Sequence, residues 1–390
     1  MNIVIFSDTF LPQCNGIATS LTQLIKGYLA EKHSVLVVTP KAADSDEAAI
    51  PGAQIYFTPS VPAVLYPELK LGFFSPKLVN ILREFNADVI HIASPITMGF
   101  TGLMYGKMTG KPVFGVFHTY FMEPEYLKII GLQRLISPLN KFLWKFTKEF
   151  YNLCDYVISP SEYVSQDLIE HGIDRSVTVI HNPLDISAIE TPASESFIEK
   201  LRVLQKRNRK YLLNVGRMSK EKSVDKLIST FAVIARKRSD VDLVIVGNGP
   251  ELSQLKLLAK ELGIEERVIF FGEVTHQDLL GSDLFSLAKS FVTLSTSEVQ
   301  PMSIIEAMYF GLPIIACKSR GMAEMVDGNG FLVEADDKEA FCTAVDLLLD
   351  DEALGQKMKK RSKLLTKKYS LAVAVQKHCE LYETALKQKK

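Results

Sequence analysis

Three things are scarce in this 390-residue sequence: excess charge of one sign, cysteine, and long apolar runs. Lys and Arg together number 45, and so do Asp and Glu, so the formal net charge is zero. This balance argues against a nucleic-acid-binding protein, which carries a basic surface. No run approaches the roughly 18 apolar residues of a membrane-spanning helix. The N-terminus has neither the basic start nor the cleavage site of a signal peptide.

The scattered cysteines and histidines predict neither disulfides nor a metal site. The five cysteines are odd in number and include no CxxC pair, which is typical of buried, reduced thiols. The five histidines other than His91 and His118 show no metal-ligand spacing. The sequence also lacks the P-loop for ATP and the full fingerprint for NAD. We therefore expect a cytoplasmic protein with no metal and no bound cofactor.

Short apolar runs alternate with helical patterns along the chain. Continuous apolar strands are expected at 2–6, 34–39, 89–92 and 113–118, and again at 211–215, 243–246, 268–271 and 291–295. Such strands, separated by helices, are typical of parallel sheets covered on both faces. The predicted fold class is α/β, with two Rossmann-like doubly wound domains that face each other across a cleft.

The alternation pauses between residues 184 and 209, a stretch that contains Pro192 and ends in a basic cluster. We place the domain boundary there. The N-terminal domain is 1–184, the linker is 185–209, and the C-terminal domain is 210–369. The last helical pattern, at about 370–390, is expected to pack back on the N-terminal domain.

The segment 295–316 (STSEVQPMSIIEAMYFGLPIIA) places acidic side chains around a helix start. Glu298 lies in the loop after a strand, Pro301 suits a first helical turn, and Glu306 lies in the helix. The free amides of Met302 and Ser303 can bind an anion such as a phosphate, and two carboxylates suit sugar and ribose hydroxyls. The alternative is that Glu306 caps or bridges locally while Glu298 is merely solvated.

The segment 214–222 (NVGRMSKEK) runs from a strand into a cationic loop. Gly216 allows close backbone approach, Arg217 offers a planar fork for phosphate oxygens, and Lys222 adds a point charge. At the carboxyl end of the domain's first strand, these groups would face the expected cleft. The alternative is a turn that carries surface charges. For the glycine turn 246–251 (VGNGPE), a plain tight turn is the favoured interpretation.

Two turns of the N-terminal domain follow predicted strands. The segment 7–19 (SDTFLPQCNGIAT) would present backbone amides near Gly16, unless it is an ordinary strand-to-helix turn. His118 ends the strand 113–118, at the side of the sheet where α/β proteins bind ligands, so it is a functional candidate. His91 lies inside a strand and is expected in or near the core.

Taken together, these residues resemble the retaining glycosyltransferases of the GT-B fold. The glycosyltransferases that the chain resembles are those of the group 1 or family 4 type. This type includes bacterial glucosyl-diacylglycerol synthases and phosphatidylinositol mannosyltransferases. The resemblance covers nearly the whole chain, and its motifs are specific through their order and spacing. They are the NGIAT turn, Phe117-His118-Thr119, Pro160-Ser161-Glu162, Val179-Ile180-His181-Asn182-Pro183, Gly216-Arg217 with Glu221-Lys222, Val246-Gly247-Asn248-Gly249-Pro250, Phe271-Gly272, and Glu298 with Glu306-Ala307-Met308 and Gly311-Leu312-Pro313.

The resemblance implies that the C-terminal domain binds a nucleotide-sugar donor. Arg217 and Lys222 would hold its diphosphate, and Glu306 would accept the ribose hydroxyls. Glu298 would contact the far hydroxyls of the donor sugar, and Val274 matches a base-contact position. The donor-binding set also includes Gly216 and the amides of Met302 and Ser303.

The resemblance implies that the N-terminal domain binds the acceptor. Gly16 would approach the donor phosphate, and His118 would lie beside the transferred sugar. The implied catalytic set is His118, Arg217, Lys222 and Glu298. The chain departs from the family at Asn182-Pro183, where Asn-Gly is common, and at Val299-Gln300-Pro301, where Gly-Phe is common. Because proline has no amide hydrogen, Pro301 removes one donor near the phosphate.

The implied reaction moves a hexose from a nucleotide-diphosphate sugar, expected to be a UDP-sugar, with retention of configuration. It needs no metal, because fixed cations stabilise the leaving diphosphate. Two other classes stay open: a hydrolysing nucleotide-sugar epimerase of the same shape, and a binding module with a degenerate site. The intact acidic and basic residues argue against the degenerate module.

The acceptor prediction depends on the segment 132–153. Its apolar residues form one helical stripe, with Lys141, Lys145 and Lys148 off the stripe and Trp144 nearby. A basic amphipathic helix with aromatics suits a membrane interface, whereas the alternative is a helix that faces the core. We expect a lipid acceptor such as diacylglycerol and a peripheral position on the inner face of the cell membrane. A polysaccharide or small-molecule acceptor is the alternative.

Overall fold

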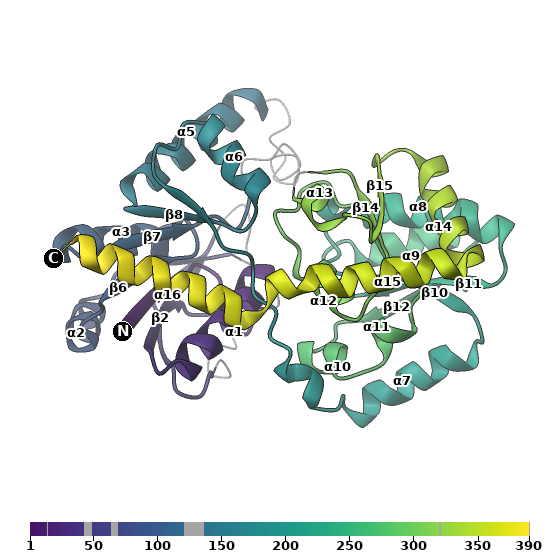
Figure 1. Ribbon diagram of the computed structural model, residues 1–390, viewed down its shortest axis with the longest axis horizontal. Coiled ribbons are helices and arrows are strands. Elements are labelled where there is room, and N and C mark those ends of the chain that lie inside the picture. Colours follow the sequence, from purple (N-terminus) through teal and green to yellow (C-terminus); the bar gives the residue numbers. More distant parts are fainter. Residues whose placement is uncertain (14, 43–48, 64–68, 121–135, 320, 390) are drawn as a thin grey trace. The chain divides into compact units, whose positions relative to one another are not determined.

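The computed structural model describes residues 1–13, 15–42, 49–63, 69–120, 136–319 and 321–389. The chain forms two compact units (Figure 1). Unit 1 is Met1–Leu184 together with Tyr369–Lys390, and unit 2 is Asp185–Lys368. Each unit is built on a parallel sheet with helices, so the predicted α/β fold with two doubly wound domains is confirmed.

Unit 1 contains a seven-stranded parallel sheet in the order β3-β2-β1-β6-β7-β8-β9. Its strands are β1 (Asn2–Phe6), β2 (Ser34–Pro40), β3 (Gln54–Thr58), β6 (Val89–Ile92), β7 (Val113–Val116), β8 (Tyr156–Ser159) and β9 (Val177–Val179). The short strands β4 (Ser60–Pro62) and β5 (Lys70–Gly72) form a separate antiparallel pair. The described helices are α1 (Gly16–Ala30), α2 (Pro76–Phe85), α3 (Thr97–Thr109), α5 (Ile136–Leu153), α6 (Glu162–Glu170) and α16 (Leu371–Gln388).

The central strand of unit 1 forms because β1 is apolar at nearly every position. Ile3 to Phe6 are fully buried, and β1 pairs with β2 on one side and β6 on the other. Polar side chains then start the helices that follow. Asn15 accepts a hydrogen bond from the amide of Ala18 at α1, and Ser161 accepts one from the amide of Val164 at α6.

The C-terminal helix α16 packs within unit 1 (yellow in Figure 1). The hydroxyl of Tyr382 lies 3.0 Å from the hydroxyl of Tyr28 on α1 and 2.8 Å from Nδ1 of His91 on β6. A Cβ atom at Gly27 would lie 2.4 Å from Cγ2 of Val375, so α1 and α16 approach closely because position 27 has no side chain. The helix expected at about 370–390 therefore covers the core of unit 1.

Unit 2 contains a six-stranded parallel sheet in the order β12-β11-β10-β13-β14-β15. Its strands are β10 (Lys210–Val215), β11 (Val241–Val246), β12 (Val268–Gly272), β13 (Ser290–Thr293), β14 (Ile314–Cys317) and β15 (Gly330–Val333). The α-helices are α7 (Glu195–Lys206), α8 (Val224–Lys237), α9 (Leu252–Glu261), α10 (His276–Leu280), α11 (Leu284–Leu287), α12 (Met302–Tyr309), α13 (Met322–Met325), α14 (Lys338–Asp350) and α15 (Glu352–Thr366). Short 3-10 helices are η3 (Ser187–Glu190), η4 (Lys220–Lys222) and η5 (Lys367–Tyr369).

The segment 185–209, predicted as a linker, is structured and belongs to unit 2. It holds η3 and the three-turn helix α7. Phe197, Leu201 and Leu204 of α7 are buried, and the Phe197 ring lies 5.9 Å from the ring of Phe271 at the end of β12. This correction has a simple cause: the apolar face of α7 covers the β12 side of the sheet.

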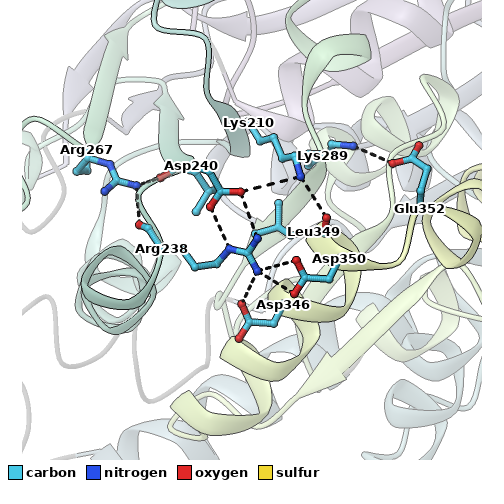
Figure 2. Close-up of polar contacts among 10 residues, drawn as sticks. Lys210, Arg238, Asp240, Arg267, Lys289, Asp346, Leu349, Asp350 and Glu352 are labelled. Carbon is cyan, nitrogen blue, oxygen red and sulfur yellow. Dashed lines mark hydrogen bonds and ion pairs between the residues drawn. The ribbon is translucent and has the colours of Figure 1, made fainter.

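The two ends of the unit 2 sheet carry different chemistry. The amino ends of its strands meet a network of ion pairs around Arg238, Asp240 and Asp350 (Figure 2). At the carboxyl ends, β10 is the strand where the winding reverses, since its neighbours are β11 and β13. In doubly wound sheets such a switch point opens a crevice that binds ligands.

Candidate active site

The loop after β10 begins with a glycine that faces open space. The amide of Gly216 continues the strand ladder by donating to the carbonyl of Val246 at 3.0 Å. A Cβ atom at Gly216 would meet no described heavy atom within 4 Å. Half-buried Arg217 follows, and Lys222 ends η4. The three predicted residues of this segment thus lie together at the carboxyl end of β10.

The glycine turn 246–251 packs against the loop after β10. Gly247 and Gly249 have φ values of +133° and +158°, and Cβ atoms there would lie 2.0 Å from the carbonyl oxygen of Gly216 and 2.3 Å from that of Met218. The amide of Met218 donates to the carbonyl of Asn248 at 2.9 Å. These glycines therefore let two backbone segments pair and so hold the loop that carries Arg217.

Lys222 and Glu298 form an ion pair that joins the loops after β10 and β13. The Nζ of Lys222 lies 2.7 Å from Oε1 of Glu298, and the two side chains are 27% and 12% exposed. The backbone supports this contact. The carbonyl of buried Glu221 accepts hydrogen bonds from the hydroxyls of Ser295 and Ser297, both at 3.4 Å. The ammonium is therefore fixed at the switch point of the sheet.

Helix α12 starts directly beyond this ion pair. Pro301 is its N-cap residue and makes no side-chain cap, while its carbonyl accepts from the amides of Ile304 and Ile305. The amides of Met302 and Ser303 belong to the first turn, where a helix offers no internal acceptor. Such groups and the helix dipole favour an anion, so the predicted phosphate contact at this helix start stays a prediction that the geometry allows.

Glu306, one turn further along α12, meets a histidine that sequence reasoning missed. Nε2 of His276 lies 2.9 Å from Oε1 of Glu306, whose side chain is 4% exposed. His276 is the first residue of α10, two residues after half-buried Val274 in the segment that follows β12. No spacing signal could have revealed this contact, because the two residues are 30 positions apart and meet only in the folded unit.

In unit 1, Gly16 and His118 follow the strands β1 and β7. A Cβ atom at Gly16 would meet nothing within 4 Å among the described residues. Burial and the nearby His378 lower the pKa of His118 to about 4, so its ring is neutral at pH 7. Within the part of the chain that the structure describes, its Nε2 atom is enclosed and has no hydrogen-bond partner. This ring therefore has unused hydrogen-bonding capacity at Nε2 and adds no positive charge.

Two other polar residues of unit 1 are structural. The carboxylate of buried Asp8 accepts hydrogen bonds from the amide of Met98 at 2.9 Å and the hydroxyl of Thr97 at 2.7 Å, at the start of α3. Burial raises the pKa of Asp8. His91 lies in the core with Nδ1 bonded to Tyr382, as predicted, and burial lowers its pKa.

The residues predicted to contact a membrane lie in different environments. Lys141 and Lys145 are exposed on α5. Trp144 stacks on His171 with ring centroids 3.6 Å apart, and the side chain of Lys148 lies beside Gly172. Residues 132–135 of the predicted helix fall outside the described residues. Trp144 and Lys148 thus pack toward the end of α6, which sequence periodicity could not indicate.

Two properties of the described residues bear on the cofactor and membrane predictions. Across the described ranges, no group of three or more His, Cys, Asp and Glu side chains is placed to hold a metal ion. Over the same ranges, no helix has the length and apolarity that a membrane crossing requires.

Comparisons with known proteins identify the family of this chain. Residues 14–188 match Glycosyltransferase Family 4, and residues 197–365 match the Glycosyl transferases group 1 family. The chain is 30% identical over 324 residues to an alpha-monoglucosyldiacylglycerol synthase of Streptococcus pneumoniae, covering 81% of this chain and 71% of that protein. It is 26% identical to a GDP-mannose-dependent alpha-mannosyltransferase of Corynebacterium glutamicum, covering 90% and 81%.

A solved structure agrees with the fold. The Anabaena protein HepE, crystallised with UDP-glucose, superposes with a TM-score of 0.76 at 21% identity, covering 98% of this chain and 99% of that one. The chain is therefore a glycosyltransferase of the GT-B fold. It belongs to the glycosyltransferase family of the group 1 or family 4 type.

Proposed function

We propose that this glycosyltransferase moves a hexose from a UDP-sugar to a lipid acceptor such as diacylglycerol, with retention of configuration and without a metal ion. The observation that carries the proposal is the Lys222–Glu298 pair at the switch point of unit 2, beside the start of α12. At the carboxyl end of the sheet, the cation and the helix start suit the diphosphate of a nucleotide sugar, and the carboxylate suits its sugar hydroxyls. HepE supports the donor class, since it was crystallised with UDP-glucose.

The proposed chemistry uses charges that the fold already holds in place. The bond between the sugar's anomeric carbon and the diphosphate oxygen breaks, and negative charge develops on that oxygen. Arg217, Lys222 and the first-turn amides of α12 stabilise this charge. The acceptor oxygen bonds to the same face of the anomeric carbon, and its proton passes to the departing phosphate. Configuration is thereby retained, and the charges balance without a metal.

Lys222 can serve the donor while it remains bonded to Glu298. An ammonium group has three hydrogen-bond donors, so one can bond the carboxylate and another a phosphate oxygen. Glu298 then has acceptor capacity left for hydroxyls of the donor sugar. In unit 1, the neutral ring of His118 would hydrogen-bond the transferred hexose.

The lipid acceptor is supported by a relative and by the surface of unit 1. One relative is named an alpha-monoglucosyldiacylglycerol synthase. On α3, Phe100, Met104 and Met108 are exposed, and an apolar groove between α3 and Leu153 of α5 also holds Lys107. Exposed apolar side chains beside a lysine suit the surface of an anionic bilayer. We propose that this face, called the α3 surface below, rests peripherally on the inner face of the cell membrane.

The donor and acceptor are tested by one screen of the purified protein. A panel of UDP-, GDP- and other nucleotide sugars is offered with and without diacylglycerol vesicles, and released nucleotide diphosphate is measured. We expect release from a UDP-hexose that depends on the lipid, and an α-linked glycolipid by NMR. Lipid-independent release, preference for GDP-mannose, or a β-linked product would each contradict the corresponding part of the proposal.

Membrane contact is tested by flotation with anionic vesicles. The double variant Met104→Asp and Met108→Asp should lose most vesicle binding, because it adds two charges to the α3 surface. The control is Leu287→Asp, an exposed apolar residue of unit 2. Equal flotation of both variants would remove the α3 surface from the proposal.

Metal independence is tested by chelation. We expect turnover to survive excess EDTA, because fixed cations stabilise the leaving group. Loss of turnover on chelation, restored by Mn²⁺ or Mg²⁺, would mean that the leaving diphosphate is stabilised by a metal ion.

A further inference from the structure

The carboxylate of Glu306 is buried and has a single partner among the described residues. Its side chain is 4% exposed, whereas that of His276 is 36% exposed. Within the described residues, Nε2 of His276 is the group that hydrogen-bonds this carboxylate, at 2.9 Å. A buried carboxylate has capacity for several hydrogen bonds, so one bond leaves it unsatisfied. Glu306 is therefore held at one oxygen and can accept further hydrogen bonds at the other.

The histidine is held in place by its own helix. Thr275 caps α10 by accepting from the amide of Asp278 at 3.0 Å. The carboxylate of Asp278 in turn accepts from the amide of Ser194 at 2.6 Å, which ties α10 to the start of α7. Leu279 and Leu280 are buried beneath it. The imidazole thus projects from an anchored element, so the contact with Glu306 does not depend on a loose loop.

The direction of the hydrogen bond between His276 and Glu306 determines how the carboxylate of Glu306 is oriented. A carboxylate only accepts, so Nε2 of His276 carries the hydrogen and donates to Oε1 of Glu306. With Oε1 anchored, rotation of the carboxylate is restricted, and the lone pairs of Oε2 have a defined direction. Two neighbouring hydroxyls, such as those of a ribose ring, need an acceptor in such a fixed direction.

We propose that His276 is a positioning residue that orients Glu306 toward the ribose hydroxyls of the donor nucleotide. It thereby sets the preference of the enzyme for ribonucleotides over nucleotides that lack these hydroxyls. The inference rests on the proposed function, because it takes unit 2 as the nucleotide site. It adds His276 to the ribose contact that the resemblance implies for Glu306.

The test measures binding of UDP and of 2′,3′-dideoxy-UDP by titration calorimetry. His276→Ala should weaken UDP binding by about tenfold, the effect of one lost charge-assisted hydrogen bond, and leave dideoxy-UDP binding nearly unchanged. His276→Gln keeps a donor near the position of Nε2 and should restore most of the preference. His276→Leu fills the space without a donor and should behave as His276→Ala. The matched control is His171→Ala, a histidine paired with Asp167 in unit 1.

The variants separate failure of this inference from failure of the proposed function. If Glu306→Ala loses the preference for UDP but both His276→Ala and His276→Leu keep it, the donor site stands and the role of His276 is overturned. If Glu306→Ala keeps the full preference, the ribose contact of the proposed function fails, and the inference fails with it. A preference that is reduced in His276→Ala but fully kept in His276→Leu would also overturn the positioning role, since bulk rather than the donor would then matter.

Discussion

The two ends of the unit 2 sheet both concentrate charge, but they do so in different ways. At the amino ends, the carboxylate of Asp242 on β11 is 1% exposed and accepts from Arg207 at 2.8 Å, Arg209 at 3.2 Å and Arg267 at 2.8 Å. Beside it, Arg238 bonds acidic groups from the loop before β11 and from α14 (Figure 2). Each buried charge there has several partners.

At the carboxyl ends, the two carboxylates of the candidate site each have one charged or titratable partner among the described residues. Glu298 pairs with Lys222, and Glu306 pairs with His276. At the same end of the sheet, Gly216 leaves open space where a side chain would be. The number of ion pairs therefore does not distinguish a binding site from a structural network. A binding site is instead marked by carboxylates that can still accept hydrogen bonds and that lie at the same sheet end as open space. The variants described next test this difference between the two ends.

The largest effect on stability is expected from the amino end. Asp242→Ala leaves three arginines around a buried space, and breaking a buried ion network typically costs about 3–5 kcal/mol. We expect a lower urea midpoint for the full chain, whereas UDP affinity of the folded protein should be unchanged in calorimetry. A loss of UDP affinity without a loss of stability would break the comparison between the two ends.

The largest effect on catalysis is expected from the carboxyl end. Lys222→Ala removes a donor to the leaving diphosphate, so turnover should fall by about 10²–10³-fold with little change in melting temperature. Lys226→Ala is the matched control, because Lys226 lies on α8 in an exposed pair with Asp336. Comparable turnover in the two variants would show that Lys222 is a surface charge and not part of the site.

Two adjacent glycines of the carboxyl end should separate folding from binding. Gly247 has a φ of +133°, and a Cβ atom there would lie 2.0 Å from the carbonyl oxygen of Gly216. Gly247→Ala should therefore lower the free energy of unfolding by about 1–3 kcal/mol. Gly216→Val places a side chain in open space and should instead weaken UDP binding. Chemical denaturation and calorimetry measure both variants. If Gly216→Val mainly lowered stability and Gly247→Ala mainly weakened UDP binding, the open space at Gly216 would not be a binding site.

Sequence patterns predicted the sheets well because buried parallel strands are apolar throughout. The run 2–6 is β1 as observed, and 268–271 is β12 to within one residue. The helix α7 was missed, although Phe197, Leu201 and Leu204 have helical spacing, because a proline before it and a basic cluster after it resemble a linker. The edge strand β15 is half-buried and only four residues long, which leaves almost no signal.

The candidate site was predictable where it follows strand ends and not where it depends on tertiary contacts. Gly216, Arg217, Lys222 and Glu298 lie beside β10 and β13, whose carboxyl ends are adjacent in any sheet with this strand order. The contact of His276 with Glu306 arises only when α10 and α12 pack in the same unit. Likewise, Trp144 has a helical position typical of a membrane face, yet it stacks on His171 of the next helix.

The smallest effect tests whether the carboxyl end also stores backbone strain. Ser223, next to Lys222, has a φ of +51°, and Asn208, at the amino end of the same sheet, has a φ of +52°. Asparagine tolerates this left-handed region better than serine. Ser223→Gly should therefore raise the free energy of unfolding by about 0.5–1 kcal/mol, and Asn208→Gly should raise it less. If the turnover of Ser223→Gly also falls, the strain helps to hold Lys222 in position for the donor. An equal gain in stability from both glycines, with turnover unchanged, would mean that the left-handed residue at the carboxyl end has no special role.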